Sequence, residues 1–162
     1  MSELHAILLA AGSSSRLGLA KQLLQYRGES LVRRTARQLI SITPHVTVVT
    51  GASADKVALE LQGLDVKLCF NAHWREGMGT SIAQAVEALP PTKRAVLIML
   101  CDQYLLDAGD LRRVVEAWRA SPEHIAVSGW GDGMGPPVIF PDSCVPRLAG
   151  LDGDRGARQL LQ

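Results

Sequence analysis

The chain has 162 residues, about the length of one domain, and 47% of them are hydrophobic against 20% charged. This composition excludes a disordered or fibrous protein, because enough apolar surface is present to offset the entropy of folding. Seventeen Lys and Arg against 16 Asp and Glu give a formal net charge of +1, and only 4% of the residues are aromatic. We therefore expect no nucleic-acid partner, since such binding favours a basic surface or a platform of stacking rings.

The cysteines and the start of the chain bear on its compartment. Cys69, Cys101 and Cys144 form no CxxC pair, which favours reduced thiols in a reducing compartment. The apolar start carries Glu3 where a signal peptide has positive charge, and no apolar run reaches membrane-spanning length. We expect a soluble, cytoplasmic protein with no membrane partner.

Short runs rich in Val, Ile and Leu recur along the chain and have the length of β-strands. The fourth run, residues 95–101, is apolar without alternation, which is typical of a parallel strand covered by helices on both faces. The predicted strands are 4–10, 46–50, 66–70, 95–101, 125–128 and 138–140.

Amphipathic segments between these runs predict three helices. The first follows an N-cap at Ser30, the second begins near Thr80 and stops at the next Pro-Pro pair, and the third follows Asp107. The alternation of strands and helices predicts a three-layer α/β/α fold with a mainly parallel sheet. No repeat or linker divides the chain, so we expect one domain over residues 1–162.

A loop of small residues follows the first predicted strand. In open α/β sheets, ligands bind beyond the carboxyl ends of the strands. Gly12 and the three serines after it allow a tight turn that points backbone N–H groups at an anion, and Arg16 and Lys21 add positive charge. The pattern predicts a phosphate-binding loop, although two merely solvated cations remain an alternative. It matches neither the Walker A motif nor GxGxxG.

Residues 9–24, LAAGSSSRLGLAKQLL, resemble the nucleotide-binding signature of the MobA-like NTP transferases, which modify molybdopterin cofactors and share a fold with sugar-nucleotide pyrophosphorylases. The resemblance implies a Rossmann-like fold of the nucleotide-diphospho-sugar transferase type. It also implies catalytic roles for Arg16 and Lys21 as ligands of the outer phosphates. The nucleotide would lie in a cradle made by Ala11, Gly12, Ser13, Ser14 and Ser15.

Residues 71–81, NAHWREGMGTS, are similar to a family segment of the type N-x(5)-G-M-x-x-S that lies near the base and ribose. The resemblance implies nucleotide-binding roles for Gly77, Gly79 and Ser81. Without it, the segment is a Gly-containing loop in which Thr80 or Ser81 caps the next helix. Capping and ligand contact can coexist.

Asp102 follows the apolar fourth strand. A carboxylate at the carboxyl end of a central strand is well placed to hold Mg²⁺ against phosphate oxygens. The family has an Asp-Gln or Asp-Met pair here, usually followed by Pro, whereas this chain has Tyr104. The alternative is that Asp102 caps the following turn. We expect Cys101 to be a buried strand residue and not a nucleophile.

Two further segments resemble the family near the carboxyl end. Residues 133–140 are similar to an element that faces the acceptor cofactor, and residues 150–158 match the G-D-x-G-A-R element of cytidylyl-type members. This second match implies Asp154 as another metal ligand, whereas on the residues alone Asp154 could cap a helix over 155–161. The chain stops at Gln162, before the closing strands that such proteins usually carry, so the domain could lack them.

Together these resemblances imply the molybdenum cofactor cytidylyltransferase branch. Such an enzyme uses Mg²⁺, transfers CMP from CTP to the phosphate of molybdenum-loaded molybdopterin and releases pyrophosphate; a molybdoenzyme or its maturation chaperone would receive the product. Ala11 stands where the guanylyl branch typically has Gly, which favours CTP over GTP. A sugar-phosphate or polyol-phosphate nucleotidyltransferase and a non-catalytic molybdopterin-binding carrier remain alternatives.

Overall fold

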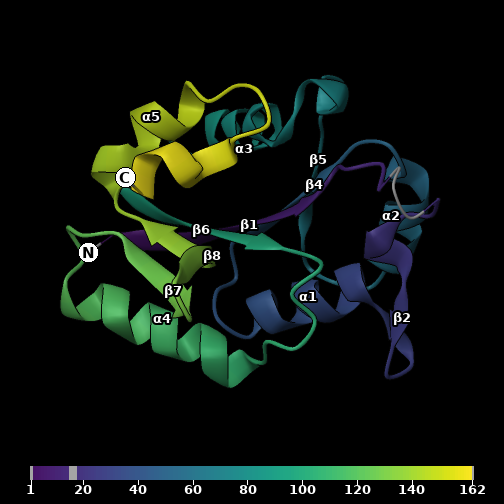
Figure 1. The fold of residues 1–162 in the computed structure, drawn as a ribbon, viewed down its shortest axis with the longest axis horizontal. Helices are drawn as coiled ribbons and strands as arrows, with labels where there is room; N and C mark the ends of the chain where they lie inside the picture. Colours follow the sequence, from purple (N-terminus) through teal and green to yellow (C-terminus); the bar gives the residue numbers. More distant parts are fainter. Residues whose placement is uncertain (1, 15–17, 162) are drawn as a thin grey trace.

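A six-stranded sheet forms the middle layer of the computed structural model, which describes residues 2–14 and 18–161 (Figure 1). The strand order is β5-β4-β1-β6-β8-β7. The first four strands of this order run parallel, and β8 and β7 each pair antiparallel with their neighbour. The strands are β1 (Glu3–Ala10), β4 (Val46–Thr50), β5 (Lys67–Phe70), β6 (Arg94–Leu100), β7 (Ala126–Trp130) and β8 (Gly133–Phe140).

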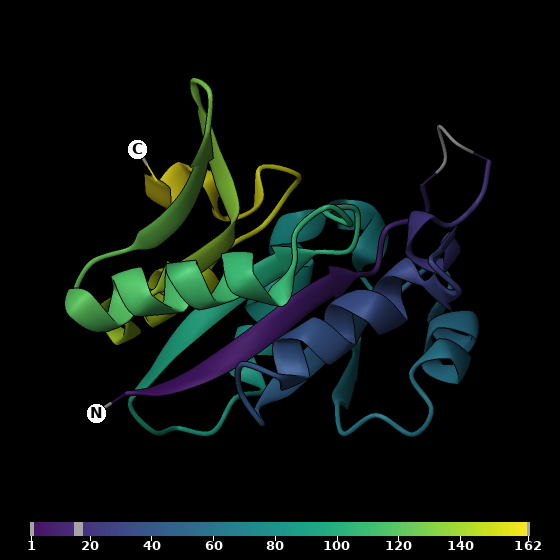
Figure 2. The same cartoon turned by 90° about the horizontal axis from the view of Figure 1, so that it is seen from below.

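Helices cover both faces of the sheet, as the views in Figures 1 and 2 show. One face carries α1 (Leu31–Ile40) and α4 (Ala108–Ala120), and the other carries α3 (Met78–Glu87) and α5 (Val145–Ala149). The smaller elements are η1 (Lys21–Leu23), the hairpin of β2 (Gln25–Tyr26) and β3 (Glu29–Ser30), α2 (Ala54–Glu60), η2 (Trp74–Glu76), η3 (Asp142–Cys144) and η4 (Gly156–Leu161).

The side chains of β1 explain why two helical layers form. Ala6 and Leu8 pack with the helices α1 and α4. Ile7 and Leu9 point to the opposite face and pack with α3 and α5. Because neighbouring side chains of a strand alternate between the two faces, an uninterrupted apolar strand requires cover on both sides. The predicted three-layer α/β/α fold with a mainly parallel sheet is confirmed.

The chain order reverses beside β1. From β1 the chain crosses to β4 and then to β5, and it returns through α3 to place β6 on the other side of β1. The loops that follow β1 and β6 therefore leave the same edge of the sheet on either side of a crevice. In open α/β sheets this is the place where ligands bind.

Two predicted helix starts are confirmed by their cap hydrogen bonds. Ser30 Oγ accepts a hydrogen bond from the backbone N–H of Arg33 at 3.3 Å. Asp107 accepts one from the N–H of Asp110, whose own carboxylate accepts one from the N–H of Asp107, both at 2.9 Å. These local signals locate α1 and α4 because each N-cap satisfies a donor that the helix itself leaves unpaired.

The start of α3 was predicted wrongly. The helix begins at Met78, so Thr80 and Ser81 lie inside its first turn and neither caps it. Gly77 occupies the N-cap position with φ +114°, a conformation that favours glycine. The helix ends at Glu87, before the Pro-Pro pair. The helix predicted over 155–161 is a 3-10 helix, Gly156–Leu161, and α2, α5 and the β2–β3 hairpin were not predicted. Among the described residues, no helix has the length and hydrophobicity to cross a bilayer.

Candidate active site

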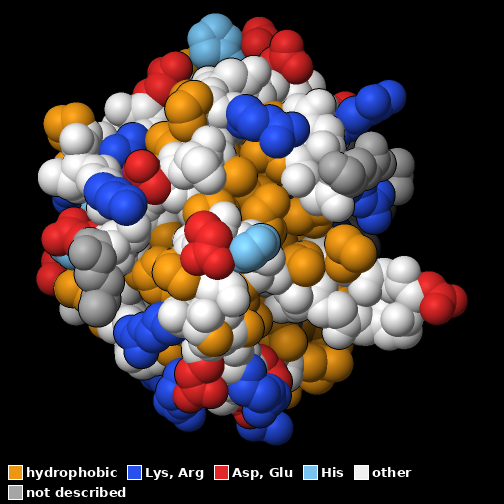
Figure 3. Space-filling view, turned by 90° about the vertical axis from the view of Figure 1, so that its left-hand side faces the viewer, with side chains coloured by type: hydrophobic (Ala, Val, Ile, Leu, Met, Phe, Trp, Pro, Cys, Tyr) orange, Lys and Arg blue, Asp and Glu red, His pale blue; other side chains and the backbone are white. Residues whose placement is uncertain are grey.

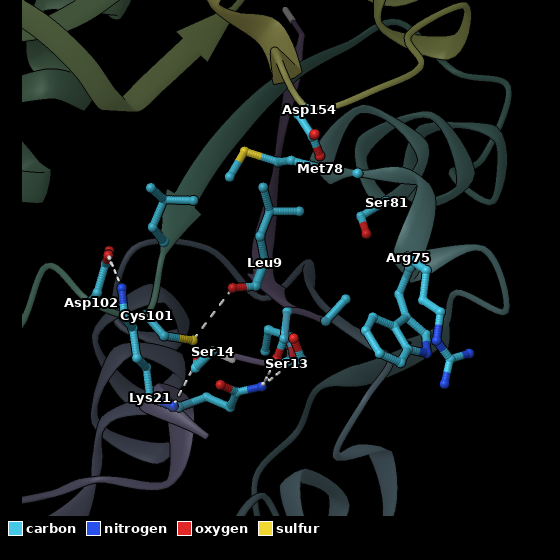
Figure 4. Close-up of a pocket in the computed structure, with 17 residues that line it drawn as sticks. Leu9, Ser13, Ser14, Lys21, Arg75, Met78, Ser81, Cys101, Asp102 and Asp154 are labelled. Atoms are coloured by element: carbon cyan, nitrogen blue, oxygen red, sulfur yellow. Dashed lines mark hydrogen bonds and ion pairs between the residues drawn. The ribbon is translucent and has the colours of Figure 1, made fainter. Parts of the chain in front are cut away.

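A cavity of about 450 Å³ opens at the edge of the sheet where β1 and β6 end (Figure 4). Several segments that are distant in sequence line it: the loop after β1, the start of η1, the η2–α3 junction, the residues after β6 and the loop before η4. Gly79 does not line it, and Ser15 and Arg16 lie outside the described residues. The predicted site residues that line it are Ala11, Gly12, Ser13, Ser14, Lys21, Gly77, Ser81, Asp102 and Asp154.

Gln22 holds the loop after β1 in place. Its side chain is 3% exposed, and its Nε2 donates hydrogen bonds to the carbonyl oxygens of Ala10 at 3.0 Å and Gly12 at 2.9 Å. The backbone N–H of Lys21 donates to Ser14 Oγ at 3.0 Å. These bonds tie η1 to both ends of the described loop. The sequence analysis missed Gln22, although it stands beside Lys21 within the stretch that resembles the family.

Lys21 and Asp102 face each other across the crevice. Lys21 Nζ lies 3.9 Å from Asp102 Oδ2, and about half of each side chain is exposed. An exposed ion pair contributes only about 0–1 kcal/mol to stability, so both charges remain available to a ligand. Within the described part of the chain, no backbone N–H donates a hydrogen bond to the Asp102 carboxylate. The turn-capping alternative therefore lacks the contact that it requires.

Cys101 precedes Asp102 and is buried. Its Sγ donates a 3.5 Å hydrogen bond to the carbonyl oxygen of Leu9, and burial raises the pKa of the thiol far above its usual range. A thiol that stays protonated is a poor nucleophile. This environment agrees with the expected structural role of Cys101.

Asn71 organises the loop between β5 and α3. The side chain is fully buried, and its Nδ2 donates to Thr80 Oγ1 and Ser81 Oγ at 2.9 Å each. Its Oδ1 accepts a hydrogen bond from the backbone N–H of His73 at 2.9 Å. Thr80 and Ser81 therefore stabilise this loop from within the helix, and Ser81, 3% exposed, also lines the cavity.

Gly77 and Gly79 are required by a close approach of the chain to itself. A Cβ on Gly77 would overlap the backbone of Gly153 and the carboxylate of Asp154, and a Cβ on Gly79 would overlap the backbone of Asp152. The N–H of Gly79 donates to the carbonyl oxygen of Gly153 at 2.8 Å. These two glycines thus let the loop that carries Asp154 dock on the first turn of α3.

An arginine that the sequence analysis missed lies on another side of the cavity. The Arg75 guanidinium carbon is 4.3 Å from the centre of the Trp74 ring, and both residues line the cavity. Figure 4 shows Arg75 on the side opposite to Lys21. The stacking holds the cation in place on an aromatic face. The signal for Arg75 in the sequence was its position beside Trp74, within the segment 71–81 that resembles the family.

A second cavity, of about 330 Å³, adjoins the first. The two share Met78, Leu100, Asp102 and Asp154 as lining residues. The strand β8 forms part of the second cavity and projects as a hairpin with β7; hydrophobic side chains gather beside that hairpin in Figure 3. Two cations, Arg155 and Arg158, also line it. An anionic ligand in the second cavity would therefore lie beside two guanidinium groups and two carboxylates.

The side chain of Gln103 connects Asp102 to the second cavity. Its Nε2 donates a hydrogen bond to the carbonyl oxygen of Pro136 on β8. Both Gln103 and Pro136 line the second cavity. The loop after β6 is therefore attached to the hairpin that bounds the cavity, which fixes where Asp102 stands relative to both spaces.

Comparisons with known proteins identify the family to which the chain is similar. A family model described as the MobA-like NTP transferase domain matches residues 6–162. PucB, the purine catabolism protein of Bacillus subtilis, is 34% identical over 172 residues, which cover 98% of this chain and 80% of PucB. The nicotine blue oxidoreductase of Paenarthrobacter nicotinovorans is 32% identical over 166 residues, which cover 96% of this chain and 80% of that protein.

Solved structures show the same fold. The crystal structure of Rv0371c from Mycobacterium tuberculosis has a TM-score of 0.84 and 28% identity over 99% of this chain and 82% of Rv0371c. Another structure of Rv0371c is a complex with manganese. The 4-diphosphocytidyl-2C-methyl-D-erythritol synthase of Anaerococcus prevotii shares the fold at a TM-score of 0.66 and 14% identity, over 88% of this chain and 71% of the synthase.

Proposed function

The chain belongs to the MobA-like NTP transferase family, and we propose that it transfers CMP from CTP to the phosphate of molybdenum-loaded molybdopterin and releases pyrophosphate. The observation that carries this proposal is the wall shared by two cavities. Asp102 and Asp154 line both. A transferase needs its donor and its acceptor to meet at one reacting phosphorus, and adjoining cavities with common carboxylates provide that meeting point. We treat residues 1–162 as one nucleotidyltransferase domain.

The cavity beside β1 is the proposed site of the triphosphate. Backbone N–H groups of the loop at residues 11–14 and the ammonium of Lys21 would bind the outer phosphates, and the resemblance adds Ser15 and Arg16. Gln22 supports this role because its hydrogen bonds to the carbonyl oxygens of Ala10 and Gly12 hold the start of the loop at the cavity. Fixed donors stabilise developing charge without reorganising during the reaction.

Asp102 and Asp154 bring two carboxylates to the lining of the proposed donor cavity. Oxygen ligands from carboxylates are those that Mg²⁺ prefers, and the Asp102 side chain is 49% exposed at the cavity. We propose Mg²⁺ as the cofactor, with Asp102 as its ligand and Asp154 as a second one. The manganese complex of Rv0371c supports a divalent cation in this family. When bound, such an ion draws negative charge from phosphate oxygens.

The cavity bounded by β8 is the proposed acceptor site. Arg155 and Arg158 would attract the acceptor phosphate, which is itself an anionic nucleophile and needs no general base. An oxygen of that phosphate forms a bond to the α-phosphorus of CTP, and the bond from the α-phosphorus to the bridging oxygen of pyrophosphate breaks. Because the reactants are all anions, positioning and positive charge carry the catalysis.

Ala11 supports the choice of CTP. It is 6% exposed, lines the donor cavity and packs against Gly51, where an added Cβ would lie 2.9 Å from the Ala11 methyl. The methyl therefore fills space between the loop and the end of β4, and we propose that it leaves less room for a purine base beside the loop. We expect kcat/KM for CTP to exceed that for GTP by about tenfold or more, which corresponds to roughly 1.4 kcal/mol.

Pyrophosphate release tests the proposal. Purified protein, Mg²⁺ and molybdenum-loaded molybdopterin would be supplied with CTP, GTP and ATP in turn and in competition. The proposal predicts release that requires both the acceptor and CTP. A preference for GTP would move the protein to the guanylyl branch. Release of pyrophosphate only with a sugar phosphate or polyol phosphate would show that this compound is the acceptor. Tight binding of molybdopterin without release of pyrophosphate would indicate a carrier that delivers the cofactor to a molybdoenzyme or its maturation chaperone.

A further inference from the structure

Three potential metal ligands meet at the amino end of β1, away from the nucleotide cavity. Glu3 and His5 are two residues apart on the strand, so their side chains point to the same face of the sheet. His45 lies beside them because Ala6 pairs with Val46 in the parallel register. One ligand atom from each of Glu3, His5 and His45 lies within 4.8 Å of the other two. In residues 2–14 and 18–161, no other trio of His, Cys, Asp or Glu has this spacing.

The contacts within the trio are specific. His5 Nε2 lies 3.4 Å from Glu3 Oε2, and the rings of His5 and His45 stack with their centroids 4.5 Å apart and their planes at 15°. The backbone around His45 is anchored to β1: its carbonyl oxygen accepts a 2.8 Å hydrogen bond from the N–H of Ala6. Its N–H donates to Thr43 Oγ1 at 3.2 Å, and that hydroxyl donates to the carbonyl oxygen of Leu4 at 2.7 Å.

The trio borders a separate cavity of about 340 Å³, which has room for an ion and its water ligands. The side chains of Glu3 and His45 are exposed, whereas His5 is only 4% exposed. An imidazole nitrogen offers its lone pair to a metal ion. Lys67 also lines the cavity, and Asp65 offsets its charge.

We propose that Glu3, His5 and His45 form a second metal site, for a divalent transition-metal ion of the Zn²⁺ type, that links β1 to β4. Two imidazoles and one carboxylate are a known ligand set for Zn²⁺ and leave a fourth position for water. Tetrahedral coordination brings ligand atoms roughly 3.3 Å apart, so the exposed side chains of Glu3 and His45 rotate inward around the fixed ring of His5. Imidazole nitrogen favours Zn²⁺ over Mg²⁺.

This site is distinct from the proposed magnesium site. Six residues of extended chain separate His5 from Ala11, which is a distance of about 20 Å at the rise of a β-strand. The proposed ion therefore joins the amino ends of two central strands and takes no part in phosphate transfer. Its binding can be measured without any substrate.

Calorimetric titration with Zn²⁺ in the presence of excess Mg²⁺ tests the proposal, because Mg²⁺ occupies the carboxylate site. We expect one Zn²⁺ to bind per chain, and His45→Ala and Glu3→Gln each to weaken its binding by about tenfold or more, since even the loss of an outer-shell partner costs that much. Both residues are exposed, so the variants should fold, which circular dichroism would verify. His5 is buried and is therefore left unchanged.

His124→Ala is the matched control, because His124 pairs with Glu123 at 3.0 Å but no second histidine joins them. It should leave the Zn²⁺ affinity unchanged. In the NMR spectrum of the unmodified protein, the ring signals of His5 and His45 should shift on addition of Zn²⁺ while those of His124 stay in place. Absence of binding, equal affinity in all variants, or loss of Zn²⁺ binding in Asp102→Asn instead would overturn the proposal.

Discussion

The backbone N–H of Gly79 donates a 2.8 Å hydrogen bond to the carbonyl oxygen of Gly153. This contact attaches the loop before η4 to the first turn of α3, where Asp154 lines the cavity proposed to bind the nucleotide. The close approach of the two segments requires glycine at positions 77 and 79, because a Cβ at either position would overlap the docked loop. The G-M-G segment and the G-D-R-G segment are therefore two halves of one structural unit.

Gly79→Ala tests whether the loop docks on α3, because it should lower the stability of the protein, whereas the same replacement in most helices raises it. In a helix, replacement of Gly by Ala normally stabilises the protein by about 1 kcal/mol. Here the added methyl would meet the backbone of Asp152, so we expect a lower melting temperature and a loss of nucleotidyl transfer. Gly150→Ala is the control, since its Cβ would lie 3.7 Å from its nearest neighbour, an ordinary contact. A melting temperature raised by Gly79→Ala would show that the loop does not dock as described.

Gln22→Ala removes the donor that holds the loop after β1. The carbonyl oxygens of Ala10 and Gly12 lose their partner, and an unsatisfied buried group costs about 1–3 kcal/mol. We expect a decrease of that size in the free energy of unfolding, measured with urea, together with weaker CTP binding. Gln25→Ala, at an exposed position on β2, should change neither quantity. If the Gln22→Ala protein were less stable but bound CTP with unaltered affinity, the hydrogen bonds of Gln22 would not contribute to nucleotide binding.

Lys21→Ala should weaken the binding of CTP much more than that of CMP. A charge-assisted hydrogen bond contributes about 1.5–3 kcal/mol, or roughly tenfold to a hundredfold in Kd, and in the proposed site only the triphosphate would reach the ammonium. Calorimetry with both nucleotides provides the comparison, and Lys56→Ala on the exposed face of α2 is the control. The same result is predicted for Arg16→Ala from the sequence alone. Equal losses for CTP and CMP would mean that Lys21 supports the loop and not the outer phosphates.

Much of the fold follows from local patterns. The runs rich in Val, Ile and Leu at β1, β4 and β6 predict strands because helices cover both faces of the sheet there and bury nearly every side chain, the threonines of β4 included. Ser30 and Asp107 predict helix starts because a cap is a contact within three residues. By contrast, α2 buries only Val57, so its hydrophobic pattern is too weak to identify a helix.

The site is less predictable because its contacts are not local. The positions of the loop after β1 and of Asp102 at one edge of the sheet could be predicted, because both follow strands of the parallel sheet. The role of Gly79 could not, because it depends on Gly153, which is distant in the sequence and meets it only in the folded chain. Gln22 is a similar case: its two acceptors lie 10 and 12 residues earlier, and no spacing rule identifies them.

Asp102→Asn should preserve the fold and abolish most turnover. The substitution is nearly isosteric, and the exposed ion pair with Lys21 that it removes contributes at most about 1 kcal/mol. We expect kcat to fall by about two orders of magnitude or more, as when other groups that stabilise transition-state charge are removed. Binding of Mn²⁺, followed by electron paramagnetic resonance, should weaken in parallel, whereas Asp55→Asn on α2 should behave like the unmodified protein. Activity near the starting level would assign the metal to other residues.

The fate of labelled phosphate groups shows whether the protein transfers CMP from a nucleotide in the first cavity to an acceptor in the second. The protein would be given Mg²⁺, molybdenum-loaded molybdopterin and CTP that carries a radioactive label at either the α- or the γ-phosphorus, and the products would be separated. The α-label should appear in the product formed with the acceptor, and the γ-label should appear in pyrophosphate. A γ-label on the acceptor, or an α-label that never joins the acceptor, would contradict nucleotidyl transfer at this site.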